Sequence, residues 1–465
     1  MVSTARTRQM LPPGPRGVPV LGMLPAVRRD PTGVFLDAAR RYGDVVYFEI
    51  AARRGFLITN PADIRHVLQD NARNYHKSPL YNKLRMSLGN GLLTSEDDLW
   101  LRQRRIAQPA FHRQRIAALA DVMAQSAREV AARWDGLASA GRPVDIGEEM
   151  MRLTRTVVLR ALLGGDLGPY ASRVDEAWVV INQHVGESFW SLGVTDWLPT
   201  PRRRRFEAAR TLLREAVDYV IAQRRRNPSD TADLLSMLLA ARDEETGEGM
   251  TDEQLRVEVT TFLLAGQETT ALALTWTWYL LSQHPEVQRR LELEIDDALD
   301  GRPPESADLV NLPYARMVID ETMRLYPPAW GFSRQALEDD LLGGYHLPRG
   351  WLAFVVPYVL HRLPAYWTAP DAFDPDRFLA ERSAERPKFV YVPFGAGPRQ
   401  CIGNHFALIE AHVIVTTLAQ RYRLRLVPHH RVEPWPLITL RPRHGMPMFI
   451  ERRSSTADRS RRVPA

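Results

Sequence analysis

The residue with the clearest chemical potential is Cys401, the sole cysteine among 465 residues. Its loop contains Gly395, Gly397 and Pro398 shortly before it and Gly403 two positions after it. Apolar residues then recur at helical spacing, so the sequence predicts a tight turn that leads into the start of a helix. Backbone N–H groups and the helix dipole at such a place lower the pKa of a cysteine. We therefore expect a thiolate here.

A thiolate in this loop can serve as a nucleophile or as a metal ligand, and the two uses need different neighbours. A nucleophile needs a base within reach. A haem iron needs one axial sulfur, a loop poor in water and donors that point at the sulfur. Phe394 can shield the sulfur from water, and Arg399 can pair with a haem propionate. The competing interpretation is a buried structural cysteine, which is the usual role of a single cysteine.

The loop resembles the haem-binding signature of the cytochromes P450 at every fixed position. The matching residues are Phe394, Gly397, Arg399, Cys401 and Gly403. The resemblance implies that Cys401 is the axial ligand of a haem b iron, and that Phe394, Arg399 and Gly403 contact the cofactor. It also implies a cytochrome P450 fold, mainly α with a small β lobe, with the haem between a long central helix and the helix after the cysteine loop.

The longest helical pattern runs over residues 252–283. Thr251 before it and Gln254 three residues later have the form of a capping box. The middle of the pattern, residues 265–270, contains a glycine and two consecutive threonines, which weaken a helix interior. A threonine hydroxyl can bond the carbonyl one turn earlier and bend the helix. We therefore predict a groove where a small ligand meets this helix.

The same stretch resembles the oxygen-binding groove of the cytochromes P450, A-G-x-[D/E]-T. By this resemblance Ala265 borders the haem, and Glu268 and Thr269 form an acid–alcohol pair that relays protons toward dioxygen. An alcohol can hold the group that receives the proton, and a carboxylate can renew the proton from solvent. The competing interpretation is a solvated glutamate beside a threonine that packs between helices.

Three further residues resemble the propionate-binding residues of the family. Trp100 and Arg104 stand four positions apart and therefore share one helical face, and both side chains can donate to a carboxylate. The resemblance assigns Trp100, Arg104 and Arg334 to the haem propionates. The alternative for Trp100 and Arg104 is an exposed basic helix.

Glu321 and Arg324 stand three positions apart in a helix predicted over residues 312–325, where their charged groups can meet. They resemble the E-x-x-R motif of the family, and Arg377 is expected to join them. We predict that these three residues are structural and not catalytic. If the pair were exposed, it would contribute only ~0–1 kcal/mol to stability.

Composition and charge limit the class of protein. Hydrophobic residues make up 45% and charged residues 25%, as in ordinary soluble globular proteins. One cysteine cannot form an intrachain disulfide, which suits a cytoplasmic protein. No apolar run approaches the ~20 residues that span a bilayer, so we expect no membrane span. The net charge of +6 comes from scattered arginines, and we favour a solvated surface over a nucleic-acid-binding one.

No repeat or linker divides the chain. We expect a disordered N-terminus at 1–10, a single cytochrome P450 catalytic domain at 11–453 and a disordered basic tail at 454–465. Local patterns also predict a helix at 31–42, a two-stranded hairpin at 44–59 and a mobile loop at 75–93.

The predicted activity is that of a haem-thiolate monooxygenase, which uses dioxygen to hydroxylate or epoxidise a lipophilic small molecule. Terpene oxidation in secondary metabolism is the preferred reaction, and fatty-acid hydroxylation is the alternative. The residues predicted to line the substrate pocket are apolar: Leu93, Phe262, Ala265, Trp330, Phe332 and Ile438.

The chain shows no motif for a second redox cofactor. Electrons from NAD(P)H are therefore expected through a separate ferredoxin or flavodoxin with its reductase. An acidic partner is predicted to dock near the cysteine loop on four basic side chains: Arg102, Arg105, Arg113 and His405. Two other classes stay open. A haem-thiolate isomerase, dehydratase or peroxygenase needs no reductase, and a haem sensor is not an enzyme; neither depends on the Glu268–Thr269 pair.

Overall fold

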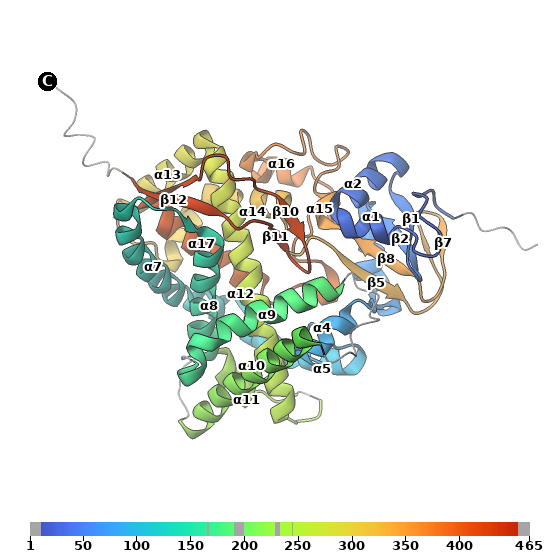
Figure 1. Ribbon diagram of the computed structural model, residues 1–465, viewed down its shortest axis with the longest axis horizontal. Coiled ribbons are helices and arrows are strands. Elements are labelled where there is room, and N and C mark those ends of the chain that lie inside the picture. The colour runs from blue at the N-terminus through green and yellow to red at the C-terminus, as the bar shows by residue number, and fades with distance from the viewer. Residues whose placement is uncertain (1–10, 165–166, 190–199, 228–232, 244, 454–465) are drawn as a thin grey trace, which may run out of the picture.

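The computed structural model describes residues 11–164, 167–189, 200–227, 233–243 and 245–453. Most of the described chain is helical and surrounds one long helix, α12, while a smaller lobe of strands lies to one side (Figure 1). The prediction of a mainly α fold with a small β lobe is confirmed. The predicted disordered ends, 1–10 and 454–465, lie outside the described residues.

The helices before α12 are α1 (Leu24–Arg29), α2 (Pro31–Tyr42), α3 (Pro61–Arg65), α4 (Tyr81–Leu88), α5 (Asp97–Ala107), α6 (Arg113–Ala118), α7 (Ala120–Ala140), α8 (Ile146–Leu163), α9 (Ala171–Phe189), α10 (Pro201–Arg226) and α11 (Leu234–Ala240). The later ones are α12 (Asp252–Gln283), α13 (Pro285–Leu299), α14 (Pro313–Leu325), α15 (Pro357–Leu360), α16 (Ala380–Ala384) and α17 (Asn404–Ala419).

The β lobe is built on a five-stranded sheet with the order β1-β2-β8-β5-β3. Its strands are β1 (Val45–Ile50), β2 (Arg53–Ile58), β3 (Tyr75–Lys77), β5 (Phe332–Ala336) and β8 (Leu352–Val355). β2 and β8 run parallel, and the other neighbours run antiparallel. The pairing of β3 with β5 sets Lys77 directly opposite Arg334. Ring contacts of Phe35 with Phe48 and Phe354 hold α2 on this sheet.

Three smaller sheets complete the described strands. They are β4 (Val144–Asp145) with β12 (Pro447–Arg452) and β9 (Tyr422–Leu426), β6 (Asp340–Leu342) with β7 (Tyr345–Leu347), and the hairpin of β10 (Pro434–Pro436) and β11 (Leu440–Pro442). The hairpin is fixed by two indoles: Trp276 Nε1 donates to the carbonyl of Leu440, and Trp330 Nε1 donates to that of Leu437, each at 2.9 Å. It therefore joins α12 to the chain segment before β5.

The bounds of α12 agree with the sequence pattern. Both bonds of the predicted capping box form, at 3.2 Å from Gln254 N to Thr251 Oγ1 and at 3.0 Å from Thr251 N to Gln254 Oε1. Apolar side chains lie on almost every face of α12, which packs against α8, α10, α14 and α17. A helix that is apolar all round belongs in the centre of a protein, and this position makes α12 the frame of the site.

Residues 75–93 differ from the prediction of a mobile loop, because they contain β3 and α4. The prediction was wrong since β3 is defined by its distant partner β5, and strand formation depends on such context more than on local residues. The predicted helix at 31–42 and the hairpin at 44–59 are confirmed as α2 and β1–β2. Within the described ranges, none of the helices is both long and apolar enough to cross a membrane.

Candidate functional site

The cysteine loop is held by backbone contacts. The N–H of Cys401 donates to the carbonyl of Phe394 at 3.0 Å, which closes the loop just before α17. Gly397 has a φ of 69°, and a Cβ at this position would lie 1.8 Å from the carbonyl oxygen of Leu68. Only glycine permits this approach. The loop position therefore depends on the packing of Gly397 against Leu68, a residue of the N-terminal part of the chain.

The sulfur of Cys401 lies in protein surroundings but not in a packed core. Cys401 is exposed, yet desolvation raises the pKa of its thiol, more than the Gly403 N–H and the Arg104 guanidinium lower it. The expectation of a lowered pKa is thus wrong for the thiol by itself. Coordination to a metal ion ionises a thiol outright.

The middle of α12 also has an accessible face. Ala265 is exposed and Thr269 is half-buried, although most residues around them in the helix are buried. The Thr269 hydroxyl donates to the Ala265 carbonyl at 2.7 Å. This is the backbone bond predicted for a groove-forming threonine. Ala265 and Thr269 therefore form an accessible strip on α12, and the groove itself stays a prediction.

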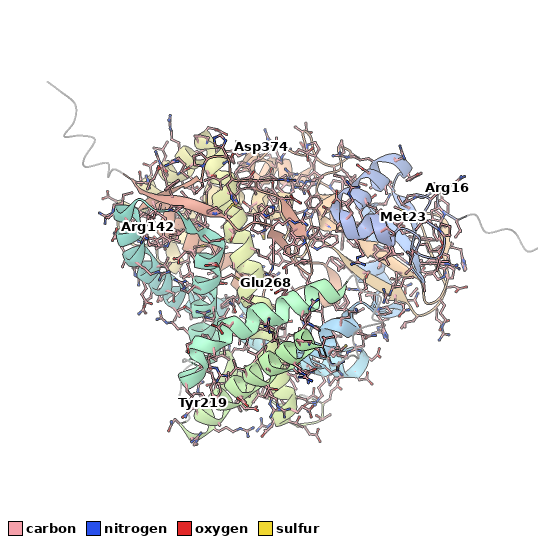
Figure 2. All side chains as sticks on the ribbon, in the orientation of Figure 1. Arg16, Met23, Arg142, Tyr219, Glu268 and Asp374 are labelled. Atoms are coloured by element: carbon pink, nitrogen blue, oxygen red, sulfur yellow. The ribbon has the colours of Figure 1, made fainter. Side chains whose placement is uncertain are left out.

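Glu268 lies near the middle of the molecule (Figure 2) and is buried, with 5% of its surface exposed. Its contacts come from the β10–β11 hairpin. Thr439 Oγ1 donates to Glu268 Oε1 at 2.6 Å, and Arg441 Nε donates to the same oxygen at 2.7 Å. Glu268 is thus next to Thr269 in the chain, but its carboxylate is bound by the β10–β11 hairpin.

The four side chains predicted to hold propionates lie around the cysteine loop and the edge of the sheet. Arg399 lies over the Trp100 ring, 4.4 Å from its centroid, and forms an ion pair with Glu96. Arg104 Nη1 donates to the carbonyl just before Cys401 at 2.9 Å. Arg334 is buried in β5, and its charge contributes to lowering the pKa of Arg399, for which burial is the main cause.

Sequence reasoning missed Lys77 in this group. Lys77 stands opposite Arg334 in the sheet, and burial lowers its pKa to about 7, with Arg399, Arg334 and Arg85 lowering it further against the opposing effect of Glu96. No local pattern marks Lys77, because its place depends on the pairing of β3 with β5. The result is a group of basic side chains, Lys77, Arg334 and Arg399, with Glu96 among them and Asp97 near Arg399.

This arrangement fits a haem. Burial and mutual repulsion lower the pKa of Lys77 and of Arg399, so Glu96 and Asp97 do not fully offset their positive charge, and buried charges are stable when paired with opposite ones. Two propionates would supply that pairing. Among the described residues, no three of His, Cys, Asp and Glu come together as ligands for a bare metal ion. A porphyrin iron needs one axial protein ligand, and Cys401 can provide it.

The structure brings Glu321, Arg324 and Arg377 together. Arg324 donates to both oxygens of Glu321 at 2.7 Å, and Arg377 Nε lies 3.3 Å from Glu321 Oε1. Glu321 and Arg324 have no exposed surface. Arg324 also donates to the carbonyls of His361 and Pro370. The surface ion pair considered above is therefore excluded, and the cluster anchors α14 to the segment that precedes the cysteine loop.

The positions predicted for the substrate pocket are not all alike. Leu93 is exposed, Phe332 and Ile438 are half-buried, and Trp330 is buried with its indole bound to the hairpin. The ring of Phe262 is buried against Phe111, with centroids 5.3 Å apart. Ala265, described above, is the predicted pocket residue on the accessible face of α12.

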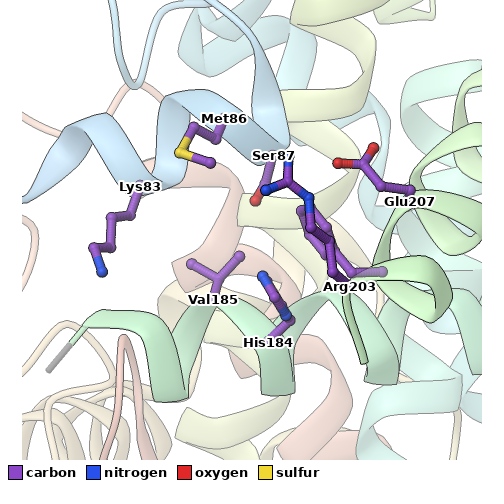
Figure 3. A pocket seen from close by; sticks show the side chains of 8 residues that line it. Lys83, Met86, Ser87, His184, Val185, Arg203 and Glu207 are labelled. Atoms are coloured by element: carbon purple, nitrogen blue, oxygen red, sulfur yellow. The ribbon is translucent and has the colours of Figure 1, made fainter. Parts of the chain in front are cut away.

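A separate pocket lies between α4, α9 and α10 (Figure 3). Its side chains include Met86 from α4, Val185 from α9 and Phe206 from α10, with charged groups at the margin. The carbonyl of Met86 accepts from Arg210 at 3.0 Å, so α10 holds the end of α4. The same three helices, α4, α9 and α10, also lie over one side of α12 (Figure 1).

The fold and the site define a haem-thiolate enzyme. The chain belongs to the cytochrome P450 family, since the family model described as Cytochrome P450 matches residues 12–446. It is therefore a haem-thiolate monooxygenase, as relatives named monooxygenase and oxygenase also indicate. The resemblance noted in the sequence is confirmed.

Similar proteins include two from Streptomyces. "Cyclooctatin synthase" of Streptomyces melanosporofaciens is 39% identical over 94% of this chain and 95% of its own length. "Pentalenene oxygenase" of Streptomyces avermitilis is 34% identical over 92% of this chain and 94% of its own. The crystal structure of the cytochrome P450DA heme domain has a TM-score of 0.87 at 28% identity, covering 96% of this chain and 98% of that one.

Proposed function

We propose that this monooxygenase oxidises a terpene, by hydroxylation or epoxidation of an apolar carbon skeleton. The observation that carries the proposal is the accessible face at Ala265 and Thr269 in an otherwise buried helix, together with the accessible residue Cys401. Apolar surroundings suit a lipophilic ligand. Relatives whose names refer to cyclooctat-9-en-7-ol and pentalenene support a terpene over a fatty acid.

The cofactor that fits is haem b, which supplies the redox chemistry for oxygen activation when it is bound. Cys401 would hold the haem iron through its sulfur, with Phe394 and Gly403 beside it. The propionates would be held by Trp100 together with the cations Arg104, Arg334 and Arg399, and by Lys77. The Gly403 N–H, which already lowers the pKa of Cys401, would donate to the ligated sulfur.

Thr269 and Glu268 are proposed to control protons at this site. The Thr269 hydroxyl donates a hydrogen bond to the Ala265 carbonyl. Its oxygen can therefore accept a hydrogen bond from a proton donor on the accessible side. Glu268 binds Thr439 and Arg441 through Oε1. A proton taken up from solvent by the Glu268 carboxylate would be released toward Thr269 when the carboxyl group rotates away from the hairpin, which leaves the carboxylate ionised again.

Electrons are proposed to come from NAD(P)H through a separate ferredoxin or flavodoxin in the cytoplasm. Arg113 Nε lies 3.1 Å from His405 Nε2 at the start of α17 and is exposed. Arg102 and Arg105 are engaged by residues that precede α12. Arg113 and His405 are thus the better docking contacts of the four predicted.

The experiment is a ligand titration of the purified haem protein, followed through the Soret band. Pentalenene, cyclooctat-9-en-7-ol and dodecanoic acid serve as probes. A terpene that shifts the spin state and is then converted to an oxygenated product under dioxygen, with surrogate redox partners, supports the proposal. A shift and product with dodecanoic acid alone would assign the site to fatty acids.

A further inference from the structure

A tight turn formed by residues 91–94 rests on the first half of α12. The N–H of Thr94 donates to the carbonyl of Gly91 at 2.8 Å, so Leu92 and Leu93 are the central residues of the turn. A Cβ on Gly91 would lie 2.7 Å from Thr261 Oγ1 of α12. The turn backbone is therefore in direct contact with the helix.

The turn is bound by a buried acid. Glu258 has no exposed surface, and its two carboxylate oxygens accept the N–H of Leu92 at 3.0 and 3.1 Å. The carbonyl of Leu92 accepts from Lys77 Nζ at 3.3 Å. Burial of a carboxylate is costly, and the pKa of Glu258 is raised to about 7 by desolvation, against the Leu92 N–H and Lys77. The carboxylate of Glu258 is thus buried at a cost in free energy, and it binds the Leu92 N–H of the turn.

The end of the turn has other supports. The Ser95 carbonyl accepts from Lys77 Nζ at 2.5 Å, and the Thr94 carbonyl accepts from Arg85 at 2.5 Å. Gln103 binds the carbonyl of Asn90 at 3.0 Å. Loss of Glu258 would therefore leave the Leu92 N–H without its carboxylate partner, while the Leu92 carbonyl stays bound to Lys77 and both ends of the turn stay attached.

Leu93 is the residue that this arrangement presents. It is 36% exposed, whereas Gly91, Leu92 and Thr94 are buried. Glu258 and Ala265 are seven residues apart on α12, so they lie on one face of the helix, about 10 Å apart along its axis. The turn thus covers the same helix face that carries the accessible Ala265.

We propose that Glu258 is a positioning residue that fixes Leu93 as a wall of the substrate space. This inference rests on the proposed function, because it concerns the selection of lipophilic substrates. A fixed leucine wall favours a rigid cyclic hydrocarbon that fits it, while a flexible chain can adapt to a mobile wall. Glu258 therefore determines the preference for cyclic terpenes over linear lipids.

The test compares E258L, E258Q and the control T261V in the haem-loaded protein. Gln can still accept the Leu92 N–H, whereas Leu cannot. Thr261 touches the turn but donates to its own helix, to the Val257 carbonyl at 2.8 Å. We expect amides of residues 91–94 to exchange about tenfold faster in E258L. We also expect the ratio of the dissociation constants of pentalenene and dodecanoic acid to change about tenfold toward the acid. E258Q and T261V should stay within about threefold of the parent protein.

Unchanged exchange and an unchanged ratio in E258L would overturn the inference, as would equal effects of E258L and E258Q. If E258L does not fold, L93A is used instead. The substitution removes the wall without touching the acid, and an unchanged ratio in L93A would likewise overturn the inference. If pentalenene never shifts the Soret band of the parent protein, the terpene assignment fails. The hydrogen exchange then still decides whether Glu258 holds the turn.

Discussion

Arg441 binds Glu268 from another element of the fold, with Nε 2.7 Å from Oε1. Thr439 donates to the same oxygen at 2.6 Å. The Glu268 side chain is 6% exposed and the Arg441 side chain 26%, so the pair lies between the protein interior and solvent. The acid of α12 is thus oriented by the β10–β11 hairpin, which also carries the predicted pocket residue Ile438.

The substitution R441Q should lower stability and disturb proton control. Removal of the guanidinium leaves a buried carboxylate with Thr439 as its remaining donor in this group, and the expected loss is about 1–3 kcal/mol in the free energy of unfolding. Chemical denaturation of the haem protein measures it. R441K serves as the charge-preserving control. In a cycle with E268Q, a coupling energy near zero would contradict the ion pair.

Replacement of Thr269 by valine should divert electrons to peroxide. The hydroxyl that accepts the proton donor is lost while the shape is kept, so product per NAD(P)H should fall about tenfold and peroxide should rise. T277V is a matched control, because the Thr277 hydroxyl likewise donates to the carbonyl four residues earlier, that of Ala273, at 2.8 Å. Equal coupling in T269V and T277V would remove Thr269 from the relay.

Disruption of the buried cluster should prevent stable folding of the haem protein. R324L leaves Glu321 buried without its main cation, and such a change costs about 3–5 kcal/mol. The fraction of protein that binds haem, and the denaturation midpoint, measure the effect. Arg349 pairs with Glu338 at 3.3 Å with both side chains more than 70% exposed, so R349Q should cost less than about 1 kcal/mol. Similar losses in R324L and R349Q would refute the structural role.

Glu258 should make stability depend on pH. Its pKa is raised to about 7 in the folded protein from an ordinary value of 4.5, so the folded state binds more protons than the unfolded state between these values. Stability contributed by this group is present below about pH 4.5 and is lost as the pH rises through about 7. The free energy of unfolding of E258Q, minus that of the parent protein, should therefore increase from pH 5 to pH 8, by at most about 1.4 kcal/mol per pH unit. A pH-independent difference would place the titration elsewhere.

The parts of the site that are contiguous in the sequence could be predicted from it. The cysteine loop, the Thr269–Ala265 hydrogen bond and the Glu321–Arg324 pair each lie within one turn or helix, whereas the partners of Glu268 come from the β10–β11 hairpin. Lys77 and Glu258 could not be found in this way. Lys77 acquires its role from the pairing of β3 with β5, and Glu258 from a turn that precedes it by more than a hundred residues in the chain.

The charge state of the sulfur was also beyond sequence reasoning. Local geometry predicted a lowered pKa, and the Gly403 N–H and Arg104 do lower it. The larger effect comes from desolvation by protein that the loop sequence does not specify. Burial is a property of the assembled fold, so it can reverse a prediction made from one loop.

The contact of Gly397 with Leu68 has a consequence for protein engineering. The placement of the cysteine loop depends on a backbone oxygen from the first hundred residues, at a separation that admits no side chain. Recombination with a relative between these two points keeps this contact only if the incoming cysteine loop also has a glycine there. Chimeras of this enzyme that replace Gly397 by any other residue should lose haem.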